Sequence, residues 1–108
     1  MSVLLISEDE RLKWTKPDAD AGFYYRRPPI YVQRDIQAKH TVKGITDNQA
    51  VVEDLLAWAI LGWFGFVDRH GNVVEYRKDL LDKVPELMKA EFIAELYSLD
   101  PVVDDLGN

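Results

Sequence analysis

The sequence predicts an α+β domain in which a small antiparallel β-sheet packs with about three α-helices. Two stretches, residues 47–61 and 85–99, carry apolar residues at steps of three and four, the spacing of an amphipathic helix. Short aromatic and β-branched segments joined by turn residues indicate β-hairpins at residues 11–27 and 64–76. Because such turn-linked segments precede helices rather than alternate with them, we expect segregated layers of strand and helix.

Length and composition favour one domain. The 108 residues, 47% of them hydrophobic, are sufficient for an independent core, so residues 1–108 are expected to form a single domain with a loose acidic tail at residues 102–108. The chain has no cysteine, which excludes disulfides and thiolate metal sites. No apolar run is long enough for a membrane span or a signal peptide, so we expect a soluble, intracellular protein.

The N-terminal part has the pattern of strands and turns. Residues 2–6 form a short apolar run that is consistent with a strand. Residues 12–15 alternate apolar and polar side chains, residues 23–26 have high β propensity, and turn-forming residues connect the two segments. Asp18 and Asp20 lie in this connection, but two carboxylates without further ligands favour a solvated loop over a cation site.

A helix is expected at residues 30–40. Pro28 and Pro29 mark the boundary before it, and proline is well suited to the first turn of a helix. The opening Ile-Tyr-Val of this stretch also fits a strand, so both interpretations stay open. Residues 41–45 form a connector with Gly44 near its end.

The central helix is predicted at residues 47–61. Thr46 and Gln49 have the spacing of a capping box, in which the hydroxyl and the amide satisfy free N–H groups at the helix start. Gly62 follows directly, and glycine readily takes the left-handed conformation that ends a helix. We therefore expect the helix to stop at this glycine.

The second hairpin follows the central helix. Residues 64–67 and 73–76 are aromatic and β-branched, and the connection from Asp68 to Gly71 is typical of a type I turn whose last residue has positive φ. Trp58, Trp63, Phe64 and Phe66 lie within nine residues, so the stretch that joins the helix to this hairpin is predicted to be the densest part of the core. The residues to which we assign structural roles are Trp58, Gly62, Trp63, Gly65, Asp68 and Gly71.

The C-terminal part predicts a short helical turn at residues 78–83 and a final helix at residues 85–99. Met88, Phe92 and Leu96 form its apolar stripe. The favoured interpretation is that this stripe packs on the central helix. The alternative is that Met88 and Phe92 are partly uncovered and bind a partner protein.

The sequence lacks the residue patterns of an enzyme. It has two histidines about thirty positions apart and no zinc-binding spacing, no serine in a glycine-flanked turn, and no glycine-rich phosphate loop. We therefore expect no catalytic residues, no cofactor and no metal site.

Charge is distributed unevenly and suggests a contact surface. Residues 1–46 carry eight Lys/Arg and six Asp/Glu, whereas residues 47–108 carry five and thirteen, and this asymmetry is compatible with head-to-tail association into a homo-oligomer. Aromatic residues and cations are interleaved in the Tyr24–Lys43 segment, which suits a protein partner or single-stranded nucleic acid. The net charge of −6 makes nucleic acid unlikely as a partner. The candidate contact residues are Tyr24, Tyr25, Arg26, Arg27, Tyr31 and Arg34.

The order of residues from Trp58 to Leu81 resembles the C-terminal half of small tail assembly chaperone-like proteins of tailed bacteriophages and prophages. In that family a helix is followed by a Gly-Trp-x-Gly segment, a Val-Asp turn and a Tyr-x-x-x-Leu-Leu segment. The chain departs from the pattern at Phe64, where the family would have a polar or acidic residue. The matching residues are Gly62, Trp63, Gly65, Val67, Asp68, Gly71, Asn72, Tyr76, Leu80 and Leu81.

The resemblance implies a non-enzymatic protein of the bacterial host cytoplasm that binds the tape-measure protein during tail assembly. The alternative from the residues alone is a small protein- or nucleic-acid-binding module that uses the Tyr24–Lys43 segment.

Overall fold

The computed structural model describes residues 11–98 and has the expected α+β architecture. The predicted strand at residues 2–6 and the acidic tail at residues 102–108 lie outside the described residues. The elements in chain order are β1 (Leu12–Thr15), β2 (Gly22–Tyr25), α1 (Ile30–Lys39), β3 (Thr41–Val42), β4 (Ile45–Thr46), α2 (Asn48–Ala59), β5 (Ile60–Phe64), the 3-10 helix η1 (Lys78–Lys83) and α3 (Glu86–Ser98).

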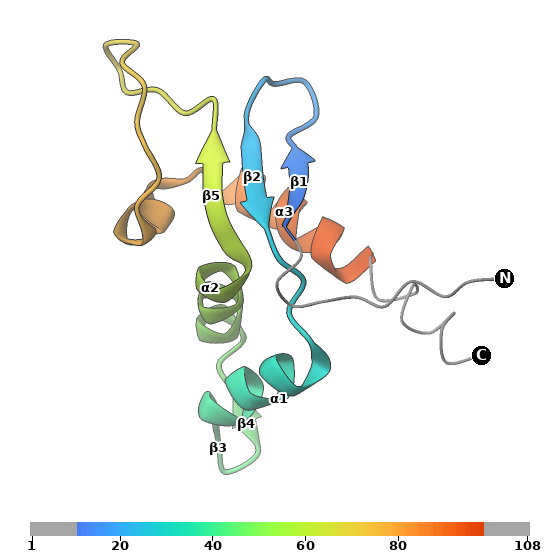
Figure 1. The fold of residues 1–108 in the computed structure, drawn as a ribbon. Helices are drawn as coiled ribbons and strands as arrows, with labels where there is room; N and C mark the ends of the chain where they lie inside the picture. Colours follow the sequence, from blue (N-terminus) through green and yellow to red (C-terminus); the bar gives the residue numbers. More distant parts are fainter. Residues whose placement is uncertain (1–10, 99–108) are drawn as a thin grey trace, which may run out of the picture.

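A three-stranded antiparallel sheet with the order β1-β2-β5 forms the centre of the molecule, and α3 crosses behind it (Figure 1). The first hairpin is confirmed, since Trp14 pairs with Phe23 across β1 and β2. Phe23 also pairs with Trp63 of β5, so it occupies the middle of the sheet. Because side chains alternate along a strand, Trp14, Phe23 and Tyr25 share the face toward α3.

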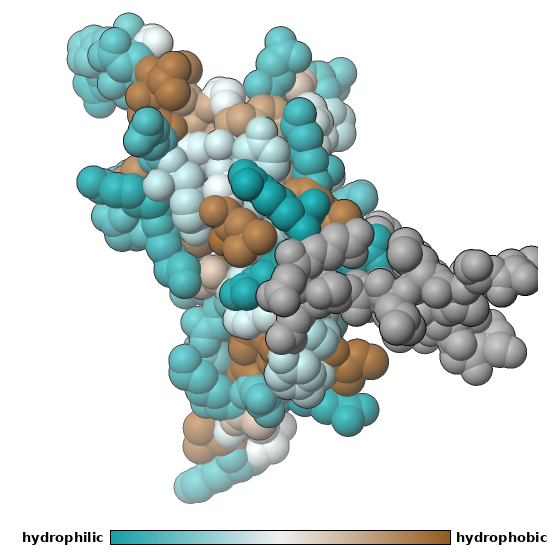
Figure 2. Space-filling view, in the orientation of Figure 1, coloured by the Kyte–Doolittle hydropathy of each residue, from teal (hydrophilic) through white to brown (hydrophobic). Residues whose placement is uncertain are grey.

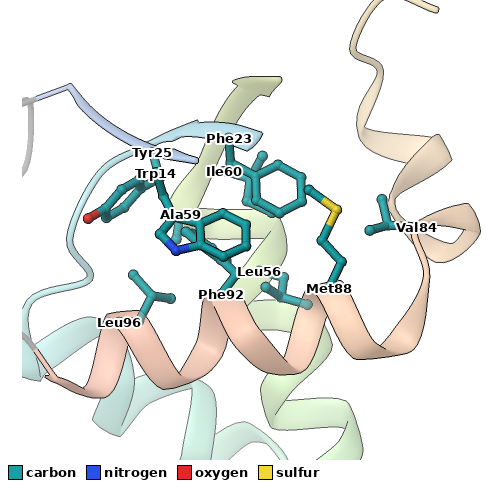
Figure 3. Close-up of a cluster of buried hydrophobic side chains, with 10 residues drawn as sticks. All are labelled: Trp14, Phe23, Tyr25, Leu56, Ala59, Ile60, Val84, Met88, Phe92 and Leu96. Carbon is teal, nitrogen blue, oxygen red and sulfur yellow. The ribbon is translucent and has the colours of Figure 1, made fainter. Parts of the chain in front are cut away.

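The core lies between this face of the sheet and α3 (Figure 3). Residues four apart on α3 form one stripe, and its central member, Phe92, is fully buried. The Phe92 ring lies 5.5 Å from the ring of Trp14, 5.0 Å from that of Phe23 and 5.1 Å from that of Tyr25, measured between centroids. The buried members of this cluster are Trp14, Phe23, Tyr25, Leu56, Ala59, Ile60, Val84, Met88, Phe92 and Leu96.

The junction between α2 and β5 differs from the prediction. The helix ends at Ala59 rather than residue 61, and Ile60 is already extended with φ −79° and ψ 122°. Gly62 lies inside β5 opposite Tyr24 and does not have positive φ, so the prediction that it ends the helix was wrong. The helical apolar spacing continues past Ala59, but pairing with β2 and burial of Ile60 favour the strand.

The start of α2 also differs by one residue from the expected capping box. Asp47 is the N-cap, and its carboxylate accepts a hydrogen bond from the Ala50 N–H at 3.2 Å. Thr46 belongs instead to β4, where its hydroxyl lies 2.7 Å from that of Thr41. The connector at residues 41–45 is therefore part of a small second hairpin, β3–β4.

Helix α1 confirms the helical interpretation of residues 30–40 and buries Val32. Its C-terminal end is fastened to α2 by Asp54, whose carboxylate lies 2.7 Å from His40 Nε2 and 3.1 Å from Lys39 Nζ. Hydrogen bonds from His40 and then from Lys39 hold the pKa of Asp54 below its ordinary value. This polar cluster joins α1 to α2, and α1 lies at the end of the molecule opposite residues 65–77 (Figure 1).

The substitution Phe92→Ala should lower the free energy of unfolding by about 3–5 kcal/mol, because removal of the buried ring leaves a cavity among three aromatic neighbours. The matched control is Tyr97→Ala on the same helix, where the side chain is 49% exposed and the expected change is within about 0.5 kcal/mol. Urea unfolding of both variants measures the difference. Equal loss of stability in the two variants would contradict the assigned core.

Candidate functional site

The structure divides the predicted contact residues among separate environments. Tyr25, Met88 and Phe92 are at most 4% exposed and belong to the core. The prediction of Tyr25 as a contact residue is therefore wrong, and so is the alternative in which Met88 and Phe92 are partly uncovered; the favoured interpretation that the stripe is packed holds. Tyr25 follows the strand alternation that places it on the same side as Phe23. Met88 and Phe92 are covered chiefly by the sheet, rather than by the central helix alone.

The remaining predicted contact residues do not form one surface either. Tyr24 lies on the face of the sheet that points away from α3, and Arg26 stacks on Trp58, with its guanidinium carbon 3.8 Å from the ring centroid. Arg26 Nε also donates to the Trp58 carbonyl at 2.9 Å. Arg27 is partly buried, whereas Tyr31 and Arg34 are exposed on α1. Tyr24 and Tyr31 thus belong to different parts of the molecule.

Residues 65–77, which we call the arm, project from the end of β5 and return to η1 (Figure 1). Two hydrogen bonds hold its sides together, from the Val74 N–H to the Phe66 carbonyl at 2.9 Å and from the Asp68 N–H to the Asn72 carbonyl at 2.9 Å. The expected pairing of residues 64–67 with residues 73–76 is reduced to a single bridge between Val67 and Val73. Phe64 pairs in β5 instead.

The tip of the arm is the turn that the sequence predicts. The Asp68 carboxylate accepts hydrogen bonds from the backbone N–H of His70 at 2.8 Å and of Asn72 at 3.0 Å, and Gly71 has φ +82°. The hydrogen bond from the Asn72 N–H, followed by that from the His70 N–H, lowers the pKa of Asp68. The ionised carboxylate therefore stabilises this turn.

The base of the arm is fixed to the sheet by aromatic side chains. Trp63 Nε1 donates to the Val74 carbonyl at 2.8 Å, and the Trp63 ring stacks on Phe66 at 4.3 Å between centroids. The Tyr76 hydroxyl donates to the Ile60 carbonyl at 3.3 Å, and burial raises the pKa of Tyr76. Trp63 and Tyr76 also meet edge to face at 5.2 Å. The two side chains position the arm relative to β5.

A pocket of about 210 Å³, which we call the arm pocket, opens between the arm and η1. Its lining is apolar except for one cation. Val67, which lines the pocket, and its bridge partner Val73 are 59% and 79% exposed. The residues that line the pocket are Trp63, Phe66, Val67, Val74, Leu80, Lys83 and Val84. Such a lining provides van der Waals contact and burial rather than proton transfer.

The described residues hold no cluster that suggests metal chemistry. Within residues 11–98, no group of three or more His, Cys, Asp or Glu side chains could hold a metal ion. Of the two histidines, His40 pairs with Asp54 between two helices, and His70 is exposed at the tip of the arm. In the same part of the chain, none of the helices has the length and apolar character needed to cross a membrane.

The sheet face opposite α3 is a second candidate surface, and most of it was missed by the sequence analysis. We call it the open face; it carries the side chains of Arg11, Lys13, Tyr24 and Phe64. The Arg11 guanidinium carbon lies 4.2 Å from the Tyr24 ring centroid, and Lys13 Nζ lies 4.7 Å from that of Phe64. The alternation of residues 11–15 was a usable signal, because Arg11 and Lys13 must lie opposite the buried Trp14.

Comparison of the chain with protein-family models, with curated proteins and with solved structures finds no match. The resemblance to tail assembly chaperone-like proteins therefore rests on the residues quoted above.

Replacing Gly65→Ala should destabilise the protein by more than Gly71→Ala. Both glycines have φ near +80°, which costs an L-residue about 1–2 kcal/mol. A Cβ at Gly65 would also collide with the Asp20 carbonyl and with Ala21, whereas a Cβ at Gly71 meets open space. Urea unfolding of the two variants tests this, and equal losses of stability would contradict the close approach of the arm to the β1–β2 turn.

The carboxyl group of Asp68 should titrate below its ordinary pKa of 3.8. Since its folded-state pKa is lowered, it stabilises the turn at pH values above the ordinary pKa, and that contribution is lost as the pH falls through the folded-state pKa. A carbon-detected NMR titration should show the carboxyl and the His70 amide shifting together at this low pH. In Asp68→Asn the His70 shift should disappear. A midpoint at or above 3.8 would contradict the turn geometry.

Proposed function

We propose that this protein is a non-enzymatic binding protein that holds an apolar segment of another protein at the arm pocket. By resemblance to tail assembly chaperone-like proteins, the partner is the tape-measure protein and the setting is the bacterial host cytoplasm during phage tail assembly. The observation that carries the proposal is the apolar pocket on a projecting arm, with the exposed Val67 in its lining and the exposed Val73 paired with Val67.

The size and lining of the pocket favour a protein side chain over a free small molecule. Pockets for drug-sized ligands usually enclose about 300–1,000 Å³ and place several polar groups to orient the ligand. The arm pocket is smaller, at about 210 Å³, and Lys83 is its one charged lining residue. An apolar side chain projecting from a partner segment would fill it and contact Val67, and the exposed Val73 would extend the contact beyond the pocket.

The residues of the resemblance coincide with this site. Trp63, Val67 and Leu80 line the pocket itself. Gly65 and Gly71 supply the positive φ that the arm requires at its base and its tip. The motif therefore shapes one structural unit that presents an apolar surface between its polar tip and η1, which is the feature that a chaperone for hydrophobic segments needs.

The alternative use of the Tyr24–Lys43 segment in nucleic-acid binding is less well supported. Single strands bind by stacking bases on exposed aromatic rings. In this protein Tyr25 is buried, and Arg11 already covers the ring of Tyr24. A base could stack there only after displacing the guanidinium.

Co-expression with the tape-measure protein tests the proposal. By the resemblance, the partner to co-express is a tape-measure protein, and we expect the parent chain to keep it soluble and to co-purify with it. Val67→Asp/Val73→Asp should abolish co-purification, because two carboxylates would be placed beside an apolar contact. The yield of soluble complex is the measurement.

The control variant is Val42→Asp/Ile45→Asp, which alters the cross-strand pair of the β3–β4 hairpin. These side chains are 68% and 77% exposed, comparable to those on the arm, but they lie at the opposite end of the molecule. The control should bind as the parent does. Failure of the parent to retain the tape-measure protein, or equal binding by both double variants, would overturn the proposal.

A further inference from the structure

The net negative charge of the chain lies entirely outside the described residues. Residues 11–98 contain all thirteen Lys/Arg and thirteen of the nineteen Asp/Glu, so their formal charges cancel. Residues 1–10 and residues 99–108 hold three acidic residues each and no Lys or Arg. The acidic residues of the second segment are Asp100, Asp104 and Asp105, interspersed with Val102, Val103 and Leu106.

The open face carries cations that have no carboxylate partner among residues 11–98. Ion pairs within this range involve Lys16, Lys39, His40, Arg77 and Lys89, and none involves Arg11 or Lys13. Each of these two cations lies instead over an aromatic ring. In this orientation the ring covers one side of the cation, and the outer side remains available to an anion.

The chemistry of this face fits a carboxylate better than a nucleotide. The rings of Tyr24 and Phe64 lie 5.3 Å apart with their planes tilted by 51°, and each is covered by a cation. Figure 2 shows this side of the molecule, where hydrophilic side chains lie across paler and brown atoms. A segment that carries carboxylates among aliphatic side chains would pair with the cations and contact the ring edges.

We propose that the open face is the docking site for residues 99–108 of the same chain. Helix α3 covers the other face of the sheet, and its C-terminal end emerges beside the edge strand β1 (Figure 1). A ten-residue segment can reach up to about 33 Å when extended. The path from α3 around the edge of β1 to Arg11 and Lys13 is short compared with this reach, since a helix with its side chains is only about 10 Å thick.

Because residues 99–108 are attached to α3, a weak contact is sufficient for docking on the open face. Each exposed ion pair contributes about 0–1 kcal/mol, so the three carboxylates would bind poorly as a separate peptide. Attachment to α3 raises their effective concentration to the millimolar range. The contact should therefore form within one chain and weaken as salt screens the charges. A partner that binds the open face would have to displace this segment.

Paramagnetic NMR on the full chain tests the proposal. Because the chain has no cysteine, Gly107→Cys provides one attachment point for a nitroxide spin label. We expect loss of the amide signals of Lys13, Tyr24 and Gly62, while the signals of the β3–β4 hairpin are retained. High salt or Arg11→Gln/Lys13→Gln should restore the lost signals. The control Arg34→Gln/Arg69→Gln, at two exposed arginines elsewhere, should not.

Three results would overturn the proposal. Signal loss that is absent from the open face, or that persists unchanged in Arg11→Gln/Lys13→Gln, would show that these cations do not hold the segment. Signal loss that appears only when an isotope-labelled chain is mixed with a separate spin-labelled chain would assign the contact to a second copy. Signal loss that appears only after Glu8→Gln/Asp9→Asn/Glu10→Gln would show that the N-terminal acidic residues occupy the face instead.

Discussion

The packing of Phe92 against Trp14, Phe23 and Tyr25 is the contact on which the rest of the structure depends. The sheet has only three strands of four or five residues, and a sheet of this size needs a hydrophobic face covered by another layer. Helix α3 covers one face only. Within residues 11–98, no helix covers the other face of the sheet. The arm that leaves β5 is held at the sheet by side chains such as Trp63 rather than by further strands.

Local signals in the sequence were sufficient for most elements and failed where distant contacts decide. Asp68 and Gly71 specify their turn through hydrogen bonds and φ within five residues, so their roles could be predicted. The end of α2 could not be predicted, because the helical spacing of apolar residues continues through Ile60. Pairing of Ile60 with β2 decides that the helix stops before it. Thr46 was mistaken for the cap of that helix because its spacing fits equally well, whereas the adjacent Asp47 takes the role.

The candidate sites, too, could be predicted only as far as local signals in the sequence determine them. Alternation along a strand predicts that Tyr24 and Tyr25 face opposite sides, but only the position of α3 determines which one is buried. The arm pocket brings Trp63 together with Leu80 and Val84, and this closure follows from the path of the arm rather than from any spacing in the sequence. The two surfaces that result differ in chemistry, one being apolar and the other cationic over aromatic rings.

The most direct test of the account is an NMR titration of the isotope-labelled chain with overlapping peptides that cover the tape-measure protein. The account predicts that apolar peptides shift the indole signal of Trp63 and the amides of Val74 and Leu80, which surround the arm pocket. Signals of α1 should remain unchanged. Shifts confined to α1 or to the open face, or no shift with any peptide, would contradict the assignment of the arm pocket as the binding site.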